Sequence, residues 1–144
     1  MSRVKIRTSD QLFSRCIRER AGWTCERCGK QHEEKSMGLH CSHFHGRGKW
    51  ATRFDPDNCL SLCYGCHSYL GAHPVKHEQF YIEKNGQQLF EIVNERANDT
   101  ALGRLAKKSE PEIRAHYRAE LERMRDLRAD GITGRIEFAG WWCW

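Results

Sequence analysis

The chain has 144 residues, of which 30% are charged and 39% are hydrophobic, and its formal net charge is +5. This length and composition predict one domain with a modest core, and they exclude a disordered, collagen-like or coiled-coil protein. No apolar run is long enough to span a bilayer, and no apolar segment follows the basic residues after Met1. We therefore expect a cytoplasmic protein with no secretory signal and no membrane partner.

The first predicted helix begins at Thr8, because Thr8-x-x-Gln11 is typical of a capping box, and it ends at Gly22. Residues 3–7 alternate basic and apolar side chains, which is typical of a short strand or an arm. The apolar residues that recur at helical spacing are Leu12, Phe13, Cys16 and Ile17.

Two short strands are predicted within residues 38–63, on either side of the loop GRGKWATRFDPD. Helical character resumes at Tyr64–Leu70 and begins again behind Pro74, a residue that suits the first turn of a helix. Gly86 then divides residues 75–97 into two short helices.

The clearest predicted helix begins at Ser109 and continues to about Ala129, where Gly131 ends it. Together with the tryptophans of the GWWCW tail, its apolar stripe exceeds what so small a core should cover, so we expect a homodimer. The alternative is that the helix covers its own domain and the tail folds over it. The stripe consists of Ile113, Tyr117, Leu121, Met124 and Leu127.

Two C-x-x-C pairs, Cys25-x-x-Cys28 and Cys63-x-x-Cys66, are separated by 34 of the 144 residues. Each pair can turn around one side of an ion, and two pairs complete a tetrahedron of thiolates with no position for water. The pattern predicts a structural Zn²⁺ that contributes directly to folding. Disulfides and redox thiols are the alternatives. Core positions are expected for two of the other cysteines, Cys16 and Cys41.

Between the cysteine pairs, Asn58 and His67 follow His43 at offsets of 15 and 24 residues. This order resembles the HNH, or ββα-metal, nuclease family, in which a histidine lies on the first strand, an asparagine follows, and a metal ligand opens the helix. Cysteine pairs flank the motif in the same way in phage endonuclease VII-type enzymes.

A closer resemblance is to the phage NinG (also called Rap) recombination nucleases, and it covers Phe13 to Arg128. It is carried by IRER before the first cysteine pair, by SHF and RFDPDN between the pairs, and by the pattern Y-x-x-x-L-x-x-x-x-x-L-R in the late helix. Single motifs of this kind are weak, but their order together is specific.

The resemblance implies an α+β fold with a ββα-metal (HNH) core, braced by the four-cysteine zinc site and flanked by N- and C-terminal helices. One compact domain would have three parts: a basic arm and helix (1–22), the zinc-braced nuclease core (23–97), and the C-terminal helix with its Trp-rich tail (98–144). The implied activity is hydrolysis of branched DNA, such as Holliday junctions and D-loops, to 5′-phosphate and 3′-hydroxyl ends.

Each motif residue has a role that fits this chemistry. A neutral imidazole can accept a proton from water near neutral pH, which suits His43 as general base. Asn58 resembles the family residue that positions this histidine or its strand. His67 would hold a catalytic Mg²⁺ or Mn²⁺ against the scissile phosphate. The alternative is a core histidine at 43 and a turn residue at 58.

The chain departs from the HNH pattern at one position. Many members have an aspartate directly before the base histidine, as a second metal ligand, and this chain has Ser42 there. A serine hydroxyl is a poor ligand, so the second ligand and the identity of the metal stay open. The additional candidates are Ser42, acting through water, and His40, His45 and His73.

Basic residues gather in the loop HGRGKWATRF, where glycines let the backbone approach phosphate and a tryptophan can stack on a base. The alternative is a solvated loop whose tryptophan packs on the core. The candidate DNA-binding residues are Arg47, Lys49, Trp50 and Arg53.

We therefore expect a phage- or prophage-encoded, metal-dependent endonuclease that acts on branched DNA in the bacterial cytoplasm. Two alternatives stay open: an HNH nicking or double-strand endonuclease without structure preference, and a zinc-stabilised DNA-binding module without catalysis. The complete set of His43, Asn58 and His67 favours an enzyme over the module. Ser42, in place of the metal-binding aspartate, favours the module.

Overall fold

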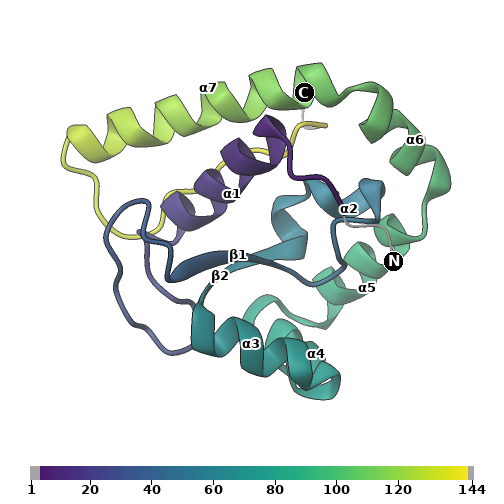
Figure 1. Ribbon diagram of the computed structural model, residues 1–144, viewed down its shortest axis with the longest axis horizontal. Helices are drawn as coiled ribbons and strands as arrows, with labels where there is room; N and C mark the ends of the chain where they lie inside the picture. The colour runs from purple at the N-terminus through teal and green to yellow at the C-terminus, as the bar shows by residue number, and fades with distance from the viewer. Residues whose placement is uncertain (1–3, 143–144) are drawn as a thin grey trace.

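An antiparallel hairpin of two short strands, β1 (Leu39–His43) and β2 (Cys59–Cys63), lies at the centre of the computed structural model, which describes residues 4–142 (Figure 1). His43 at the end of β1 pairs with Cys59 at the start of β2. The helices of the described residues are α1 (Thr8–Arg20), α2 (Trp50–Arg53), the 3₁₀ helix η1 (Pro56–Asn58), α3 (Tyr64–Ala72), α4 (Pro74–Asn85), α5 (Gln87–Ala97), α6 (Thr100–Lys108) and α7 (Glu110–Ala129).

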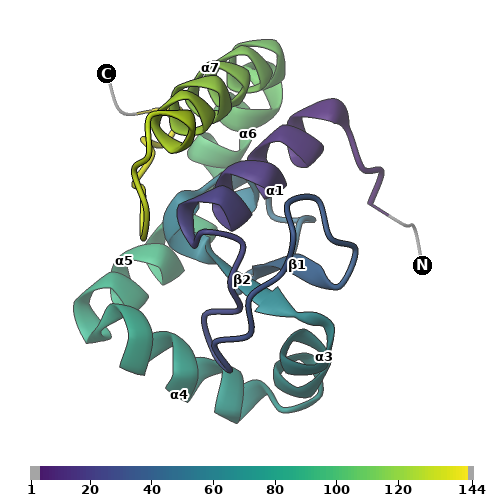
Figure 2. The same cartoon turned by 90° about the vertical axis from the view of Figure 1, so that its left-hand side faces the viewer.

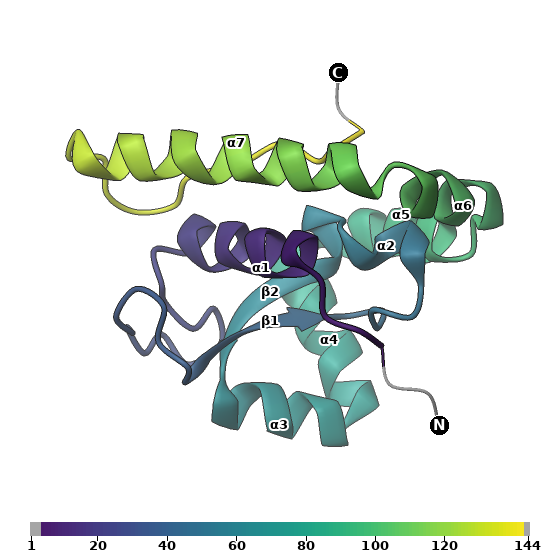
Figure 3. The same ribbon diagram turned by 45° about the horizontal axis from the view of Figure 1, so that its top comes forward.

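The elements are stacked in layers. Helix α7 lies on α1, α1 covers one face of the hairpin, and α3 lies on the other side (Figures 1 and 3). Figure 2 shows the hairpin between α1 and α3 from the side. The α+β class predicted from the sequence is confirmed. Among the helices of residues 4–142, none has both the length and the apolar character that a membrane span requires.

The two faces of the hairpin carry different side chains, because successive strand residues point to opposite sides. The face toward α1 carries Cys41, His43 and Cys59, and both cysteines join the main core with Phe13 of α1. The face toward α3 carries His40 of β1 and two apolar side chains of β2, Leu60 and Leu62, which pack on α3. These belong to a second apolar cluster made of Trp23, Cys25, Leu39, Leu60, Leu62, Cys66 and Leu70.

The main core lies between α1 and α7. Tyr117 is fully buried at its centre, and its hydroxyl donates a hydrogen bond to the carbonyl of Phe54 at 2.5 Å. The predicted stripe faces inward as a set, and burying each such side chain stabilises the fold by about 1.5–3 kcal/mol. Ile113, Tyr117, Leu121 and Met124 are buried, and Leu127 is partly buried.

The chain after α7 returns along α1 and α7 (Figure 1) and completes this core with Ile136, Phe138 and Trp141. The N–H of Trp141 donates to the Tyr117 hydroxyl at 3.2 Å, and Trp144 lies outside the described residues. Helix α7 therefore covers its own domain, and its stripe is not exposed for the homodimer interface expected from the sequence. A homodimer stays a prediction, without this interface to support it.

The start of α1 differs from the prediction. The N-cap is Arg7 rather than Thr8, and the Arg7 N–H donates to the Asp10 carboxylate at 2.8 Å. Asp10 is held in place because it also forms a buried ion pair with Arg53. Residues 4–7 contain no strand.

Three helical segments were missed. The predicted loop between the strands contains α2 and η1, and α6 was not predicted at all. Asp99 caps α6 by accepting a hydrogen bond from the N–H of Leu102 at 2.9 Å. Within α6, Gly103 packs against α2: a Cβ atom there would lie 3.6 Å from the Ala51 nitrogen, an ordinary van der Waals distance.

Candidate functional site

The cysteines of the two C-x-x-C pairs form one cluster. Their sulfur atoms all lie within 4.8 Å of one another, and the sulfurs of Cys28 and Cys63 are 3.8 Å apart. A tetrahedral zinc with Zn–S bonds of about 2.3 Å holds its sulfurs about 3.8 Å apart. The cluster is therefore compatible with the predicted structural zinc. Its members are Cys25, Cys28, Cys63 and Cys66.

Hydrogen bonds from two tight turns hold these sulfurs in place. The N–H of Cys28 is 3.5 Å from the Cys25 sulfur, and the N–H of Cys66 is 3.4 Å from the Cys63 sulfur. The Arg27 guanidinium adds a bond of 3.3 Å to Cys66, and such donors stabilise thiolate charge. Cys63 is both the last residue of β2 and the N-cap of α3. A cation in the cluster would therefore fix the start of α3 on the hairpin.

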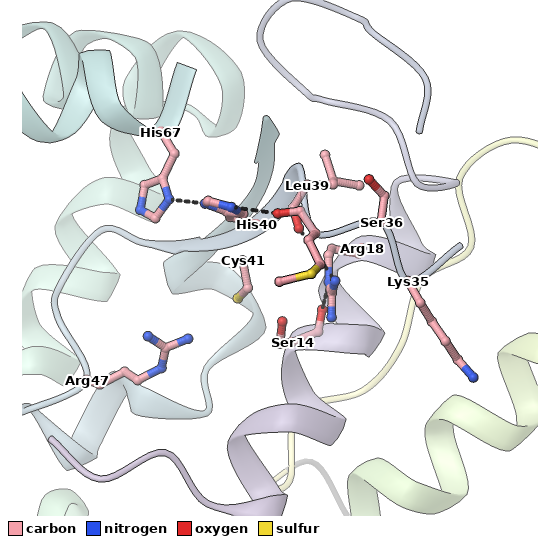
Figure 4. A pocket seen from close by; sticks show the side chains of 10 residues that line it. Ser14, Arg18, Lys35, Ser36, Leu39, His40, Cys41, Arg47 and His67 are labelled. Carbon is pink, nitrogen blue, oxygen red and sulfur yellow. Dashed lines mark hydrogen bonds between the residues drawn. The ribbon is translucent and has the colours of Figure 1, made fainter. Parts of the chain in front are cut away.

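His67, in the first turns of α3, faces His40 of β1. Their Nδ1 atoms are 3.0 Å apart, and the two rings meet edge to face (Figure 4). The Nε2–H of His40 donates to the carbonyl of Met37 at 3.0 Å, which leaves the lone pair of His40 on Nδ1. Burial, His40 and Arg47 lower the pKa of His67. Both rings line a surface pocket of about 350 Å³, and they form a pair of nitrogen donors suited to a divalent cation.

The other candidates for the second ligand are engaged elsewhere or enclosed. The Nε2 atom of His45 is 2.8 Å from the amide oxygen of Asn94. His73 stacks on Tyr69 and donates to its carbonyl at 2.7 Å. Ser42 is 2% exposed, and its hydroxyl makes no hydrogen bond within residues 4–142. Of the four candidates Ser42, His40, His45 and His73, the structure brings His40 to His67.

His43 lies at the end of β1 in a partly buried position beside the Phe13 ring. Its Nε2–H donates to the carbonyl of Arg53 at 3.0 Å. Burial and the nearby Arg47 guanidinium lower the pKa of His43 to about 4. The imidazole is therefore neutral at pH 7, and its lone pair resides on Nδ1.

Asn58 is 1% exposed and fastens the loop that follows His43. Its amide oxygen accepts a hydrogen bond from the N–H of His45 at 2.8 Å. Its amide nitrogen donates to the carbonyl of His45 at 2.9 Å and to that of Thr52 at 3.0 Å. These bonds join the two ends of the loop and fix the segment that carries the Arg53 carbonyl, to which His43 is bound.

Arg47 reaches into the pocket that His40 and His67 line (Figure 4). Its positive charge lowers the pKa of both His43 and His67, so it lies near both rings. The Nε atom is 4.0 Å from Asp10 and makes no hydrogen bond within the described residues. This guanidinium is available to an anionic ligand.

The remaining basic-loop candidates occupy different environments. Lys49 is exposed at the tip of the loop. Arg53 is 2% exposed and holds both carboxylate oxygens of Asp10, at 2.7 and 2.9 Å. Trp50 is partly buried against the main core, with the guanidinium groups of Arg7 and Arg53 over its ring at 5.4 and 4.4 Å. Trp50 thus packs on the core, which was one of the two arrangements left open, and Arg53 has an internal partner.

Two residues at this site were missed. Arg18 lines the pocket, and its Nε–H donates to the Ser14 carbonyl at 3.2 Å; the IRER motif that contains it was its only signal. Asp10 holds Arg53 from a distance of 43 residues along the chain, and no local pattern in the sequence marks such a pair.

A protein-family model described as Bacteriophage Lambda NinG protein matches residues 3–127. No curated protein and no solved structure matches the chain.

Proposed function

The chain belongs to the phage lambda NinG family, which is related to phage recombination, and on this premise we propose that it is a metal-dependent HNH-type endonuclease that cuts branched DNA. We propose the substrate class because the family is related to phage recombination. The chemistry follows from the residues around the hairpin.

The observation that carries the proposal is the state of His43. Its Nε2–H is committed to the Arg53 carbonyl at 3.0 Å, and its lowered pKa keeps the ring neutral. Within the described residues its Nδ1 atom makes no hydrogen bond. A neutral, oriented imidazole with a free lone pair is what a general base needs to take a proton from water.

The residues suited to the catalytic cation are His40 and His67, whose Nδ1 atoms are 3.0 Å apart. His40 is oriented by the Met37 carbonyl, an arrangement that commonly fixes metal-bound histidines. A bound Mn²⁺ or Mg²⁺ would stabilise the negative charge on the leaving oxygen. Two imidazoles favour Mn²⁺, because Mg²⁺ prefers oxygen ligands. In this proposal His40 replaces the aspartate that is missing at Ser42.

The other residues hold the substrate and the base. The Arg47 guanidinium lines the pocket and lies near His43, where it can donate to phosphate oxygens as His43 accepts the proton of the attacking water. Asn58 keeps the loop in the conformation that orients His43. Lys49 is exposed on the same loop and is suited to a neighbouring phosphate.

We assign the four-cysteine cluster a structural Zn²⁺, since its sulfur spacing matches a tetrahedral thiolate shell. The ion would brace α3 and so place His67. On this basis the zinc has no direct part in the reaction.

The test uses the purified protein with a four-way junction, a fork and a linear duplex of matched sequence, each with Mn²⁺, with Mg²⁺ or with EDTA. We expect cleavage of the junction with Mn²⁺, slower cleavage of the linear duplex, and none with EDTA. Equal cleavage of all three substrates would indicate the endonuclease without structure preference. Binding without cleavage under every condition would indicate the DNA-binding module and overturn the enzymatic proposal.

A further inference from the structure

A second cluster of metal-ligating atoms lies on the α1 face of the hairpin, apart from the four-cysteine cluster. Cys41 and His43 are two residues apart on β1, and Cys59 of β2 pairs with His43. One ligand atom from each of these residues, two sulfurs and a ring nitrogen, lies within 4.8 Å of the others.

The donors of this cluster are chemically selective. Thiolate and imidazole ligands suit zinc and other borderline or soft cations, whereas Mg²⁺ and Ca²⁺ prefer oxygen. Zinc bound by two cysteines and a histidine would leave a fourth position open. The distances need to contract by about 1 Å from their upper limit to reach the spacing of a tetrahedral shell.

The surroundings favour a negatively charged sulfur at Cys41, whereas burial raises the pKa of Cys59, and a pocket provides access to Cys41. Three guanidinium groups lie close enough to stabilise a Cys41 thiolate, those of Arg47, Arg18 and Arg20. Cys41 also lines the pocket that His40 and His67 share, so an ion can reach it from the surface. Cys59 is 2% exposed, which closes the inner side of the site.

We propose that Cys41, His43 and Cys59 form a second zinc site, and that zinc bound there removes His43 from its role as general base. Zinc binding would release the thiol protons to solvent and occupy the lone pair that the reaction needs. The inhibitory consequence rests on the proposed function, whereas zinc binding itself does not. Mn²⁺ would then activate the protein and excess Zn²⁺ would inhibit it.

The binding test compares the full chain with Cys41→Ser, Cys59→Ser and Cys16→Ser, under reducing conditions. Cys16 is the matched control, because it is equally buried in the same core but its sulfur is directed at the Tyr117 carbonyl. We expect wild type and Cys16→Ser to bind one more zinc ion per chain than Cys41→Ser or Cys59→Ser. The Co²⁺-substituted proteins should lose a matching part of the thiolate-to-cobalt absorption. A second zinc ion retained in Cys59→Ser, or only one ion in wild type, would overturn the site.

The activity test adds Zn²⁺ to cleavage reactions that contain saturating Mn²⁺, and compares each variant with its own rate without added Zn²⁺. Wild type and Cys16→Ser should lose cleavage as the second zinc ion binds. Cys59→Ser should need a zinc concentration at least about 10-fold higher for the same loss of cleavage, because a ligand has been removed. Equal zinc sensitivity in Cys59→Ser would refute the inhibitory role. If wild type binds the second zinc ion but cleaves no DNA even with saturating Mn²⁺ and no added Zn²⁺, the proposed function is refuted and the zinc site is left intact.

Discussion

The four-cysteine cluster and the His40–His67 pair both bring metal donors to α3, but they are built in different ways. The cluster uses two local turns whose own N–H groups hold the sulfurs. The histidine pair joins residues 27 apart in the chain and depends on how α3 packs against β1. Cys66 and His67 are neighbours, so the histidine pair depends on the cysteine cluster, whereas the cluster does not depend on the pair.

This dependence separates folding from chemistry. The cysteine cluster should control whether the hairpin and α3 stay together, and the histidines should control only what happens at the pocket. Substitutions in the two regions should therefore give different losses: loss of the fold for the cysteines, and loss of cleavage alone for the histidines.

Cys63→Ser should unfold the domain. Structural zinc contributes about 10–16 kcal/mol in small zinc-binding peptides, which is comparable to the whole stability of a domain of about 5–15 kcal/mol. Circular dichroism, thermal unfolding and zinc content would measure the loss, with Cys16→Ser as the control that keeps its zinc. A folded Cys63→Ser protein with a full zinc content in the cluster would contradict the assignment.

His43→Ala should lower the cleavage rate by about 10²–10⁴-fold, because only the general base is lost. Affinity for the junction and the zinc of the four-cysteine cluster should not change. His116→Ala is the matched control, since His116 also bonds to a backbone carbonyl, that of Ala139 at 2.7 Å, but lies on α7 and does not line the pocket. A wild-type rate in His43→Ala would refute its role.

His40→Ala and His67→Ala should each reduce cleavage by about 10–100-fold at low Mn²⁺, with partial recovery when the Mn²⁺ concentration is raised. His73→Ala is the control, because His73 is bonded to Tyr69 instead. Rates measured across a Mn²⁺ titration would show the effect. If His40→Ala does not respond to Mn²⁺ while His67→Ala does, the second ligand is another residue, with Ser42 the next to test.

The smallest expected effect is on the pH dependence of kcat/KM at low pH. The base acts in its neutral form, which exists above its pKa, and burial with Arg47 lowers the pKa of His43 from 6.5 to about 4. His43 should therefore keep kcat/KM nearly constant as the pH falls from 7 to about 5. Arg47→Gln removes a positive charge, so the pKa should rise and the decline should begin at a higher pH. If kcat/KM declines at the same pH in wild type and Arg47→Gln, Arg47 does not lower the pKa of the base.

The sequence predicted features that depend on short spacing or strong local preference. The C-x-x-C turns fix their sulfurs within four residues, and α7 shows its stripe over 20 residues. Features set by distant partners could not be predicted in the same way. At the start of α1 the N–H of the N-cap, Arg7, is bound by the carboxylate of Asp10 and not by Gln11, and Asp10 is also held by Arg53.

In the candidate site, too, some residues could be predicted from local spacing and others only from contacts between distant parts of the chain. His43, Asn58 and His67 were predicted from their order, which resembles the HNH motif. The choice of His40 over His45 and His73 required the position of α3 on the hairpin, because all three histidines look alike in the sequence. The internal role of Arg53 likewise depends on a carboxylate that lies on α1.

The pairing of β1 with β2 has a consequence for how the family can vary. A strand turns its side chains over with every residue, so inserting or deleting one residue within β1 would exchange its two faces. His40 would then turn toward α1, and Cys41 and His43 would turn toward α3. Length differences among related chains should therefore be excluded from the hairpin and collect in exposed segments such as residues 129–135.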